Sequence, residues 1–300
     1  MFKVLVPATT ANLGPGFDSL GMALTKYSTY ECELNDNIDI QIEGIEKEKL
    51  NVENNLVVNS MNKLFDYVGK YPTGYTLKIN NGIPMARGLG SSASAIVGGL
   101  IVANELVGNP LGKEELLNLA TEIEGHPDNV APALLGELIL STKTSDGKVI
   151  YRSIKPFEDL RCVVFIPEYE VSTKDSREVL PEYISMEDTV HNSSHLGLLI
   201  MGFLTGDKEL IGITMDDRIH EPYRKVLIKK FDEFKKAALD AGAFAFSLSG
   251  SGSTIIAYCS ESESNMVCEA MQNLANKSNI AGVASVLEPC VNGPIYERGD

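Results

Sequence analysis

A loop rich in glycine and serine, residues 84–94 (PMARGLGSSAS), runs directly into an apolar segment with helical spacing. Gly88 and Gly90 let the backbone turn tightly and approach a ligand, because no Cβ atom stands in the way. Ser91 and Ser92 suit a helix N-cap, and their hydroxyls can bind phosphate or a metal ion. Because free N–H groups and the helix dipole both favour an anion at such a position, the loop predicts a phosphate site.

The loop matches neither of two widespread nucleotide-binding patterns. No lysine follows Gly90, as it would in a P-loop, and no third glycine completes a G-x-G-x-x-G pattern. A glycine- and serine-rich loop before a helix is also compatible with an ordinary capped turn. A nucleotide site therefore needs support from other parts of the chain.

The chain of 300 residues carries 26 basic and 41 acidic residues, a formal net charge of -15. This charge argues against a nucleic acid or an anionic membrane as the main partner, so an anionic ligand must be held by local donors. The five cysteines are scattered without a C-x-x-C pair, which favours neither a disulfide framework nor a zinc site and fits a reducing cytoplasm. The apolar run before Pro7 is too short for a signal peptide, and we expect no membrane-spanning segment.

Two further loops are dense in glycine and small polar residues. Residues 8–21 follow a short predicted strand that should end at Pro7, and Asn12 and Asp18 are the strongest polar side chains in this loop. Such Asx residues also form turns by bonding to their own backbone. Residues 247–254 form the other loop, with four serines among its glycines. Loops of this kind are either connections or walls of a ligand site.

Hydrophobic periodicity and turn residues predict a mixture of strands and helices. In the first half we expect strands at 38–43 and 75–79, helices at 55–68, 95–107 and 113–124, and a hairpin of residues 138–142 and 149–154. In the second half we expect a strand at 160–166, then helices, strands at 244–248 and 254–259, a helix at 263–276 and a strand at 282–287. This order of elements predicts a split βαβ unit. A change of composition near Pro156 suggests two domains, residues 1–155 and 156–300.

The three loops, at residues 7–21, 84–94 and 247–254, resemble in order and spacing the three signature motifs of the GHMP kinases. The resemblance spans essentially the whole chain. It implies an α+β fold with two domains: an N-terminal, ATP-binding mixed α/β domain like domain 2 of ribosomal protein S5, and a C-terminal ferredoxin-like domain. It also implies that the third loop packs against the active site and supports the other two.

Within that superfamily, residues 8–21, 172–177 and 216–222 resemble the corresponding segments of the homoserine kinases. Mevalonate and galactose kinases carry a basic residue and a P-G-E or G-E segment in the first motif, and this chain has neither. The resemblance implies an enzyme of threonine biosynthesis, and a cytoplasmic location is expected from the cysteines, as described above. It would transfer a phosphoryl group from ATP, with Mg²⁺, to the side-chain hydroxyl of homoserine. A homodimer is compatible with this resemblance, since relatives are often dimers.

The resemblance implies roles for four polar residues at the substrate. Homoserine carries a carboxylate, an ammonium group and the reacting hydroxyl. Arg177 and Arg218, matched to the family's carboxylate ligands, offer a two-pronged fork that lysine lacks, although each is also typical of a surface arginine. Asp18 suits the ammonium group, and Asn12 can both donate to the substrate and accept from it.

The resemblance also implies the ligands of the nucleotide and of the metal ion. We expect ATP to contact Asn55, Pro84, Arg87, Gly88, Leu89, Gly90, Ser91, Ser92, Ala93 and Ser94, with backbone N–H groups around its phosphates. Ser92 and Glu122 would hold Mg²⁺ between the β and γ oxygens, although Glu122 is also compatible with a solvated helix carboxylate beside Glu124. Asn55 equally suits a helix cap.

The catalytic residues are expected within residues 126–129. Asp128 matches the aspartate that many relatives place against the substrate hydroxyl, whereas in homoserine kinases the neighbouring asparagine, here Asn129, is thought to contact it. His126 could accept a proton near neutral pH, but its position after a glycine also suits a cap. Because phosphoryl transfer depends mainly on positioning and charge neutralisation, no strong base is required. We predict that Asn129 orients the hydroxyl, supported by His126 and Asp128.

Two alternatives stay open from the sequence. The first is a kinase of the same superfamily for another small alcohol, such as mevalonate or shikimate; the set of Arg177, Arg218 and Asp18 argues against an uncharged sugar. The second is a non-catalytic sensor on the same fold, since a fold alone does not establish turnover. The intact loop of residues 84–94, called the phosphate loop below, and Glu122 argue against the sensor.

Overall fold

The computed structural model describes residues 1–51 and 54–299, whose strands form one sheet of seven strands and one of four. The first sheet contains β1 (Phe2–Ala11), β2 (Leu20–Leu34), β3 (Asp39–Gly44), β4 (Tyr75–Asn81), β5 (Leu138–Lys143), β6 (Val149–Ile154) and β11 (Ile295–Arg298). Its order is β11-β1-β2-β4-β3, with β5 paired to the start of β2 and β6 paired to β5. The expected hairpin of β5 and β6 is confirmed.

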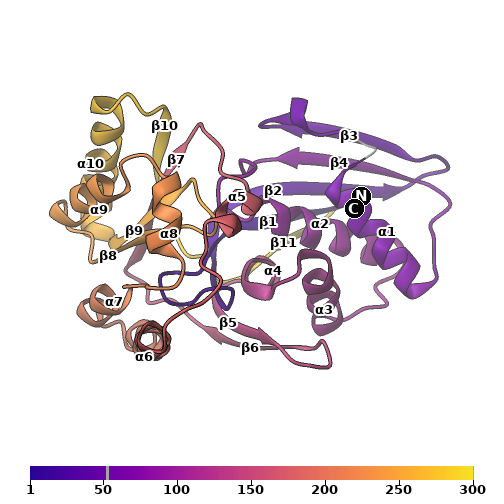
Figure 1. Cartoon of the computed structure of the whole chain (residues 1–300). Helices are drawn as coiled ribbons and strands as arrows, with labels where there is room; N and C mark the ends of the chain where they lie inside the picture. Colours follow the sequence, from indigo (N-terminus) through magenta and orange to yellow (C-terminus); the bar gives the residue numbers. More distant parts are fainter. Residues whose placement is uncertain (52–53, 300) are drawn as a thin grey trace.

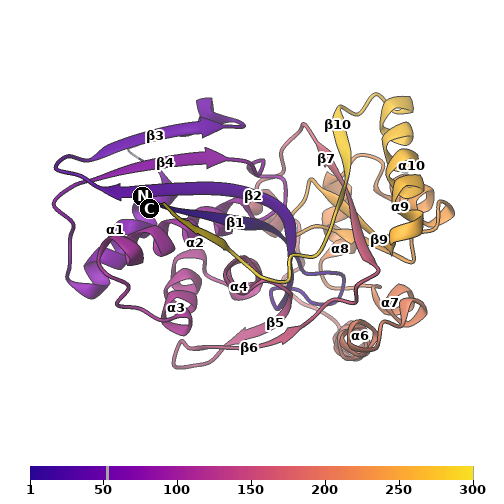
Figure 2. The same ribbon diagram turned by 180° about the vertical axis from the view of Figure 1, so that it is seen from behind.

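Four helices cover one face of this sheet: α1 (Leu56–Val68), α2 (Ser91–Leu106), α3 (Lys113–Glu124) and α4 (Pro127–Leu135). They lie in front of the strands in Figure 1 and behind them in Figure 2, which shows the opposite side. α2 is the central helix and is buried along almost its whole length, because apolar or small residues occupy nearly every side of it. The phosphate loop is thus anchored by a helix that cannot shift without disturbing the core.

The second sheet has the order β10-β7-β9-β8 and is antiparallel throughout. It contains β7 (Leu160–Pro167), β8 (Ala245–Leu248), β9 (Ile255–Ser260) and β10 (Gly282–Leu287). Helices α9 (Phe231–Asp240) and α10 (Ser264–Lys277) share one apolar cluster with it, and α6 (Met186–Thr205) and α7 (Lys208–Thr214) share another. The expected split βαβ arrangement is therefore confirmed. The remaining short helices are α5 (Thr173–Glu178), α8 (Glu221–Arg224), η1 (Lys47–Lys49), η2 (Lys225–Leu227) and η3 (Glu261–Glu263).

Several elements differ from the expectation. The prediction that Pro7 ends the first strand is wrong: β1 continues to Ala11, and its register against β2 shifts between Pro7 and Ala8. The sequence reasoning also missed β2 and helix α4. Helix α4 begins at Pro127, a position where the N–H group that proline lacks would have no hydrogen-bond partner within the helix. Finally, β11 pairs with β1, so both ends of the chain meet at one edge of the first sheet (Figures 1 and 2).

The division of the chain near residue 156 stays a prediction. β6 ends at Ile154 in the first sheet and β7 begins at Leu160 in the second, but β11 returns to the first sheet. Among the described residues, none of the helices is both long enough and apolar enough to span a membrane.

Candidate active site

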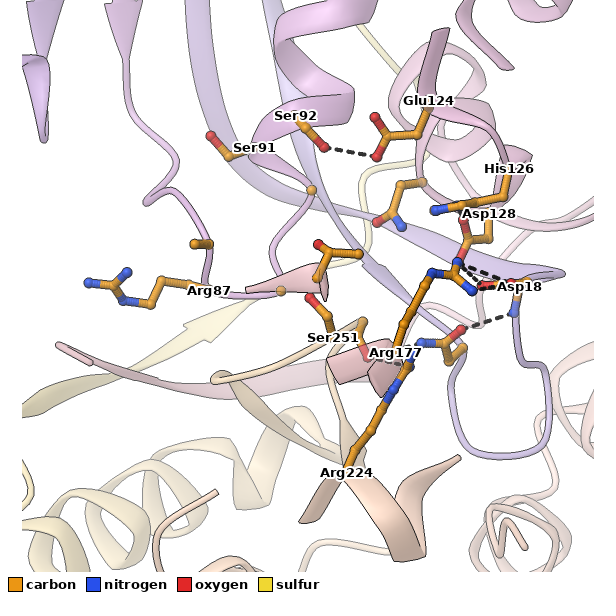
Figure 3. A pocket seen from close by; sticks show the side chains of 17 residues that line it. Asp18, Arg87, Ser91, Ser92, Glu124, His126, Asp128, Arg177, Arg224 and Ser251 are labelled. Atoms are coloured by element: carbon orange, nitrogen blue, oxygen red, sulfur yellow. Dashed lines mark hydrogen bonds and ion pairs between the residues drawn. The ribbon is translucent and has the colours of Figure 1, made fainter. Parts of the chain in front are cut away.

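A cavity of about 250 Å³ opens where the three glycine-rich loops meet, and Figure 3 shows the side chains that line it. Its walls come from the first loop, the phosphate loop, the junction of α3 and α4, α5, α8 and the third loop. The lining residues are Asn12, Asp18, Ala86, Arg87, Gly88, Gly90, Ser91, Ser92, Glu124, His126, Asp128, Asn129, Thr173, Arg177, Arg224, Gly250 and Ser251. Segments that are far apart in the sequence thus form one polar site.

The phosphate loop places the N-terminus of α2 at this cavity. The N-cap is Gly90 and not a serine, because the backbone there is left-handed, with φ at 67°. A Cβ atom at Gly90 would lie 1.9 Å from the Oγ1 atom of Thr9, and one at Gly88 would lie 2.1 Å from the carbonyl oxygen of Ser249. Both glycines are therefore required by close packing as well as by conformation. The opening turn of a long buried helix is suited to an anion.

The third loop braces the other two, as expected from the sequence. The hydroxyl of Ser249 donates to the carbonyl oxygen of Gly88 at 2.6 Å and also hydrogen-bonds to the hydroxyl of Thr10 at 2.9 Å. The N–H of Gly250 donates to the carbonyl oxygen of Ala11 at 3.1 Å. The relative position of the first loop and the phosphate loop is thus fixed by hydrogen bonds that cross between the two sheets.

The carboxylate beside the phosphate loop is Glu124, and not Glu122 as expected. The Ser92 hydroxyl donates to Glu124 at 2.8 Å, whereas Glu122 is exposed and pairs with Lys63, also at 2.8 Å. The two glutamates are separated by roughly 200° around the axis of α3, because each helical residue turns by about 100°. Burial raises the pKa of the Glu124 carboxyl, and the nearby Asp128 adds to this effect. A cation at this position would therefore be favoured.

The first turn of α4 presents the expected catalytic residues to the cavity. His126 is the N-cap residue, and its Nδ1 atom hydrogen-bonds to the buried carboxylate of Asp128. This bond raises the pKa of the His126 imidazole above its ordinary value. Asn129 accepts a hydrogen bond from the Thr9 hydroxyl at 2.8 Å through its Oδ1 atom. Its amide NH₂ group therefore stays available to donate to a ligand in the cavity.

Opposite α4, the first loop places a carboxylate against a guanidinium group. Asp18 accepts hydrogen bonds from both terminal nitrogens of Arg177, at 3.0 and 3.1 Å (Figure 3). Asn12 is buried beneath this pair: its Oδ1 atom accepts from the N–H of Asp18, and its Nδ2 atom donates to the carbonyl oxygen of Gly250. Asn12 therefore fixes the loop that carries Asp18.

The second arginine at the cavity is Arg224, which the sequence reasoning missed. Arg218, which was expected there, extends instead toward α6, where it pairs with Glu187 and Asp188 at 3.5 and 3.6 Å. Arg224 is buried, lines the cavity and donates from Nε to the carbonyl oxygen of Ser176 at 3.0 Å. Helix α8 turns the chain between the two arginines, so only the second one faces the cavity.

The turn that separates these two arginines is held by one buried carboxylate. Asp217 accepts from the N–H groups of Ile219, His220 and Glu221, and the amide of Asn192 donates to it at 2.6 Å. The signal in the sequence was the segment His-Glu-Pro-Tyr-Arg at 220–224. Its proline predicts that a helix starts there, and Arg224 lies four residues after His220, so both residues are on the same side of that helix.

A second, more apolar cavity of about 200 Å³ adjoins the first and shares Ala86, Ser91 and Ser92 with it. Its other lining residues are Tyr30, Leu50, Asn55, Leu56, Val57, Ile79, Asn81, Met85 and Ala95. Asn55 both lines this cavity and caps α1, since its side chain accepts from the N–H of Val57 at 2.9 Å. The two cavities therefore lie side by side at the start of α2, one more apolar and the other polar.

Other residues of the predicted nucleotide set support the loop from behind. The side chain of Arg87 points away from the cavity (Figure 3) and donates to the carbonyl oxygens of Pro167 and Met85, both at 2.8 Å. Leu89, Ala93 and Ser94 are buried in the core beneath the loop, and Pro84 is half-buried. These side chains therefore hold the backbone of the loop in place.

Comparisons with known proteins agree with this geometry. Residues 55–137 match the family model of the GHMP kinases N terminal domain, and residues 199–277 match that of the GHMP kinases C terminal domain. A homoserine kinase of Trichodesmium erythraeum is 42% identical over 297 residues, covering 98% of this chain and 97% of the relative. One of Carboxydothermus hydrogenoformans is 46% identical over 87% of this chain and 86% of the relative.

Solved structures give the same result. The crystal structure of a homoserine kinase from Cytophaga hutchinsonii matches with a TM-score of 0.89 and 34% identity, covering 99% of this chain and 97% of that one. A mevalonate kinase of L. major, solved in complex with R-mevalonate, matches with a TM-score of 0.72 and 16% identity, over 96% of both chains. The second likeness shows the fold alone.

Proposed function

The chain belongs to the homoserine kinases of the GHMP kinase family, and we propose that its two joined cavities bind the two substrates of that reaction side by side. The enzyme transfers a phosphoryl group from ATP to the side-chain hydroxyl of homoserine, a step of threonine biosynthesis. The observation that carries the proposed binding mode is the place of Asp18, Arg177 and Arg224 beside the phosphate loop. This set matches an amino acid and does not match an uncharged alcohol.

ATP extends across both cavities in this proposal. The adenine fits the apolar cavity beside Asn55 and Val57, and the phosphates reach the start of α2 at Gly90, Ser91 and Ser92. The shared lining residues support this placement, because they let one elongated molecule pass from the apolar end to the polar end. The third loop keeps the phosphate loop in position during transfer.

Homoserine occupies the polar end, between the first loop and α8. Its carboxylate accepts charge-assisted hydrogen bonds from Arg177 and Arg224, and its ammonium group donates hydrogen bonds to Asp18. Arg177 and Asp18 bond to each other in this structure, and a zwitterion offers a new partner to each of them. Asn129 faces the substrate from α4 and donates its free NH₂ group to the hydroxyl, so that an oxygen lone pair points at the γ-phosphate.

Mg²⁺ fits the residues beside the phosphate loop. The hydroxyl of Ser92 and the carboxylate of Glu124 bond to each other, and oxygen donors of this kind are what this cation prefers. The raised pKa of the Glu124 carboxyl marks a buried acid without a full counter-charge, which a cation would supply. When bound, Mg²⁺ would neutralise charge on the phosphates. Glu124 therefore replaces Glu122 as the proposed ligand.

His126 and Asp128 act as a pair in this proposal. Because the pKa of His126 is raised by its bond to Asp128, the imidazole binds its proton more tightly than a free imidazole does, and the bond keeps the carboxylate occupied. The pair therefore orients the first turn of α4 beside the transferred group. A strong base is not needed for a loose phosphoryl-transfer transition state.

The test is release of ADP from Mg-ATP with homoserine, mevalonate, shikimate or galactose as acceptor. We expect turnover with homoserine alone. Turnover with another alcohol would remove the roles proposed for Arg177 and Arg224 but keep the nucleotide site. Binding of ATP without turnover on any acceptor would favour a sensor. A cytoplasmic location stays a prediction, and so does a homodimer.

A further inference from the structure

The aromatic ring of Phe17 lies in the first loop beside both arginines of the polar cavity. The guanidinium carbon of Arg224 lies 4.9 Å from the centre of the ring, and that of Arg177 lies 5.8 Å from it. The imidazole of His220 stacks on the same phenyl group, with 5.2 Å between the ring centres and 22° between the planes. One side chain thus contacts three groups from α5 and α8 that surround the substrate site.

The two arginines need such a contact because they repel each other. Burial, and then the charge of Arg177, lower the pKa of Arg224 to about 10, because both disfavour a charged guanidinium group there. Asp18 neutralises Arg177 through two-point hydrogen bonds, whereas Arg224 bonds to the neutral carbonyl oxygens of Ser176 and Gly250. The negative face of an aromatic ring attracts a guanidinium group without removing its hydrogen-bonding capacity.

His220 contacts the ring without adding a third charge. It is fully buried, its Nε2 atom donates to the carbonyl oxygen of Gly14 at 2.8 Å, and its Nδ1 atom is buried without a hydrogen-bond partner among the described residues. Burial lowers the pKa of this imidazole, so it stays neutral. The bond to Gly14 and the stack on Phe17 join the first loop to the turn that carries Arg224.

We propose that Phe17 is a positioning residue for homoserine: its ring holds Arg177 and Arg224 at the spacing that one carboxylate requires, and His220 holds the ring. This inference rests on the proposed role of the two arginines as carboxylate ligands. It assigns to the loop a task beyond carrying Asp18. The phenyl group itself does not touch the reacting atoms.

The experiment compares Phe17→Leu with Phe17→Tyr in the full-length enzyme. Leucine keeps apolar bulk but has no aromatic face, whereas tyrosine keeps the face. We expect Phe17→Leu to raise the KM for homoserine about tenfold, in line with two cation–π contacts, while kcat and the KM for ATP change less than about twofold. Phe17→Tyr should stay within about threefold of the unaltered enzyme in every parameter.

L-2-aminobutyrate provides a separate measure of binding, because it keeps the carboxylate and ammonium group but lacks the hydroxyl. Its competitive inhibition constant should rise in Phe17→Leu by the same factor as the KM for homoserine. Phe157→Leu is the matched control: this ring packs at a tilt against Phe244, with 6.4 Å between the ring centres, away from the cavity, and its loss should leave both constants unchanged.

Three results would overturn the inference. One is an unchanged KM in Phe17→Leu; another is an equal loss for ATP and homoserine, which would indicate general damage to the loop. The third is failure of Phe17→Tyr to retain binding in a variant that unfolds at the same temperature as the unaltered enzyme. If Arg224→Lys also left the KM for homoserine unchanged, the carboxylate role of the arginines would fail with it, which separates the two proposals.

Discussion

Ser92, in the first turn of α2, donates a hydrogen bond of 2.8 Å to Glu124, in the last turn of α3. This bond joins the phosphate loop to the helix that precedes the first turn of α4. It brings together two oxygen donors, one from each helix, at the place where the phosphates of ATP are proposed to bind. The pairing distinguishes Glu124 from Glu122, which lies two residues earlier on α3 and forms its ion pair with Lys63.

The first prediction concerns these two glutamates. Glu124→Gln removes the charge that would hold Mg²⁺, so we expect kcat to fall by about 100-fold and the Mg²⁺ concentration needed for half-maximal rate to rise. Glu122→Gln removes only an exposed ion pair and should change kcat less than about twofold. Steady-state ADP release over a range of Mg²⁺ concentrations checks both. Equal losses in the two variants would contradict the assignment.

The second prediction concerns the arginines. Arg224→Lys keeps the charge but loses the planar fork and the bond to Ser176, so we expect the KM for homoserine to rise by about 30-fold or more with little change in the KM for ATP. Arg218→Lys changes a residue that pairs with acidic side chains of α6, and its KM for homoserine should be normal. A larger effect at Arg218 than at Arg224 would restore the expectation from the sequence.

The sequence predicted the phosphate loop and its helix well, because local chemistry determines them. Glycines at 88 and 90, two serines and an apolar helical repeat act within a dozen residues, and the structure places them as a unit at the start of α2. The split βαβ unit was predictable for the same reason, since each of its strands and its last helix has its own periodicity.

The errors arose where a side chain's direction depends on a turn or on the far part of the chain. Glu122 and Glu124 have the same chemistry, and only the packing of α3 beside α2 decides which one faces Ser92. Likewise, the turn held by Asp217 points Arg218 outward and Arg224 inward. β11 was missed because its partner, β1, lies almost three hundred residues earlier.

The third prediction tests the close packing at the phosphate loop. Gly90 has a left-handed backbone, and a Cβ atom there would lie 1.9 Å from the Thr9 hydroxyl oxygen, which bonds to Asn129. Gly147 is equally left-handed, with φ at 88°, but nothing lies within 4 Å of its Cβ position. Alanine at either site should cost about 1–2 kcal/mol of unfolding free energy from conformation alone.

Gly90→Ala should lose further stability from the clash, and its KM for ATP should rise because the loop must move. Gly147→Ala should show the conformational cost and normal kinetics. Chemical denaturation and ADP release measure the two effects on the same preparations. Normal kinetics in Gly90→Ala would mean that the site tolerates displacement of the loop.

The fourth prediction is a dependence of stability on pH through His126. Its hydrogen bond to Asp128 raises the pKa of the folded imidazole above the ordinary value of 6.5. A raised pKa means that the folded protein binds the proton more tightly than the unfolded chain. The contribution of this bond to the free energy of unfolding is therefore fully present below about pH 6.5 and is lost as the pH rises through the folded pKa.

His126→Gln keeps a polar side chain but does not titrate. We therefore expect the difference in unfolding free energy between the unaltered enzyme and His126→Gln to be largest in mildly acidic solution and to shrink toward alkaline pH. Urea titrations at several pH values measure this difference, and a difference that is constant with pH, or that grows toward alkaline pH, would contradict a protonated His126 bonded to Asp128.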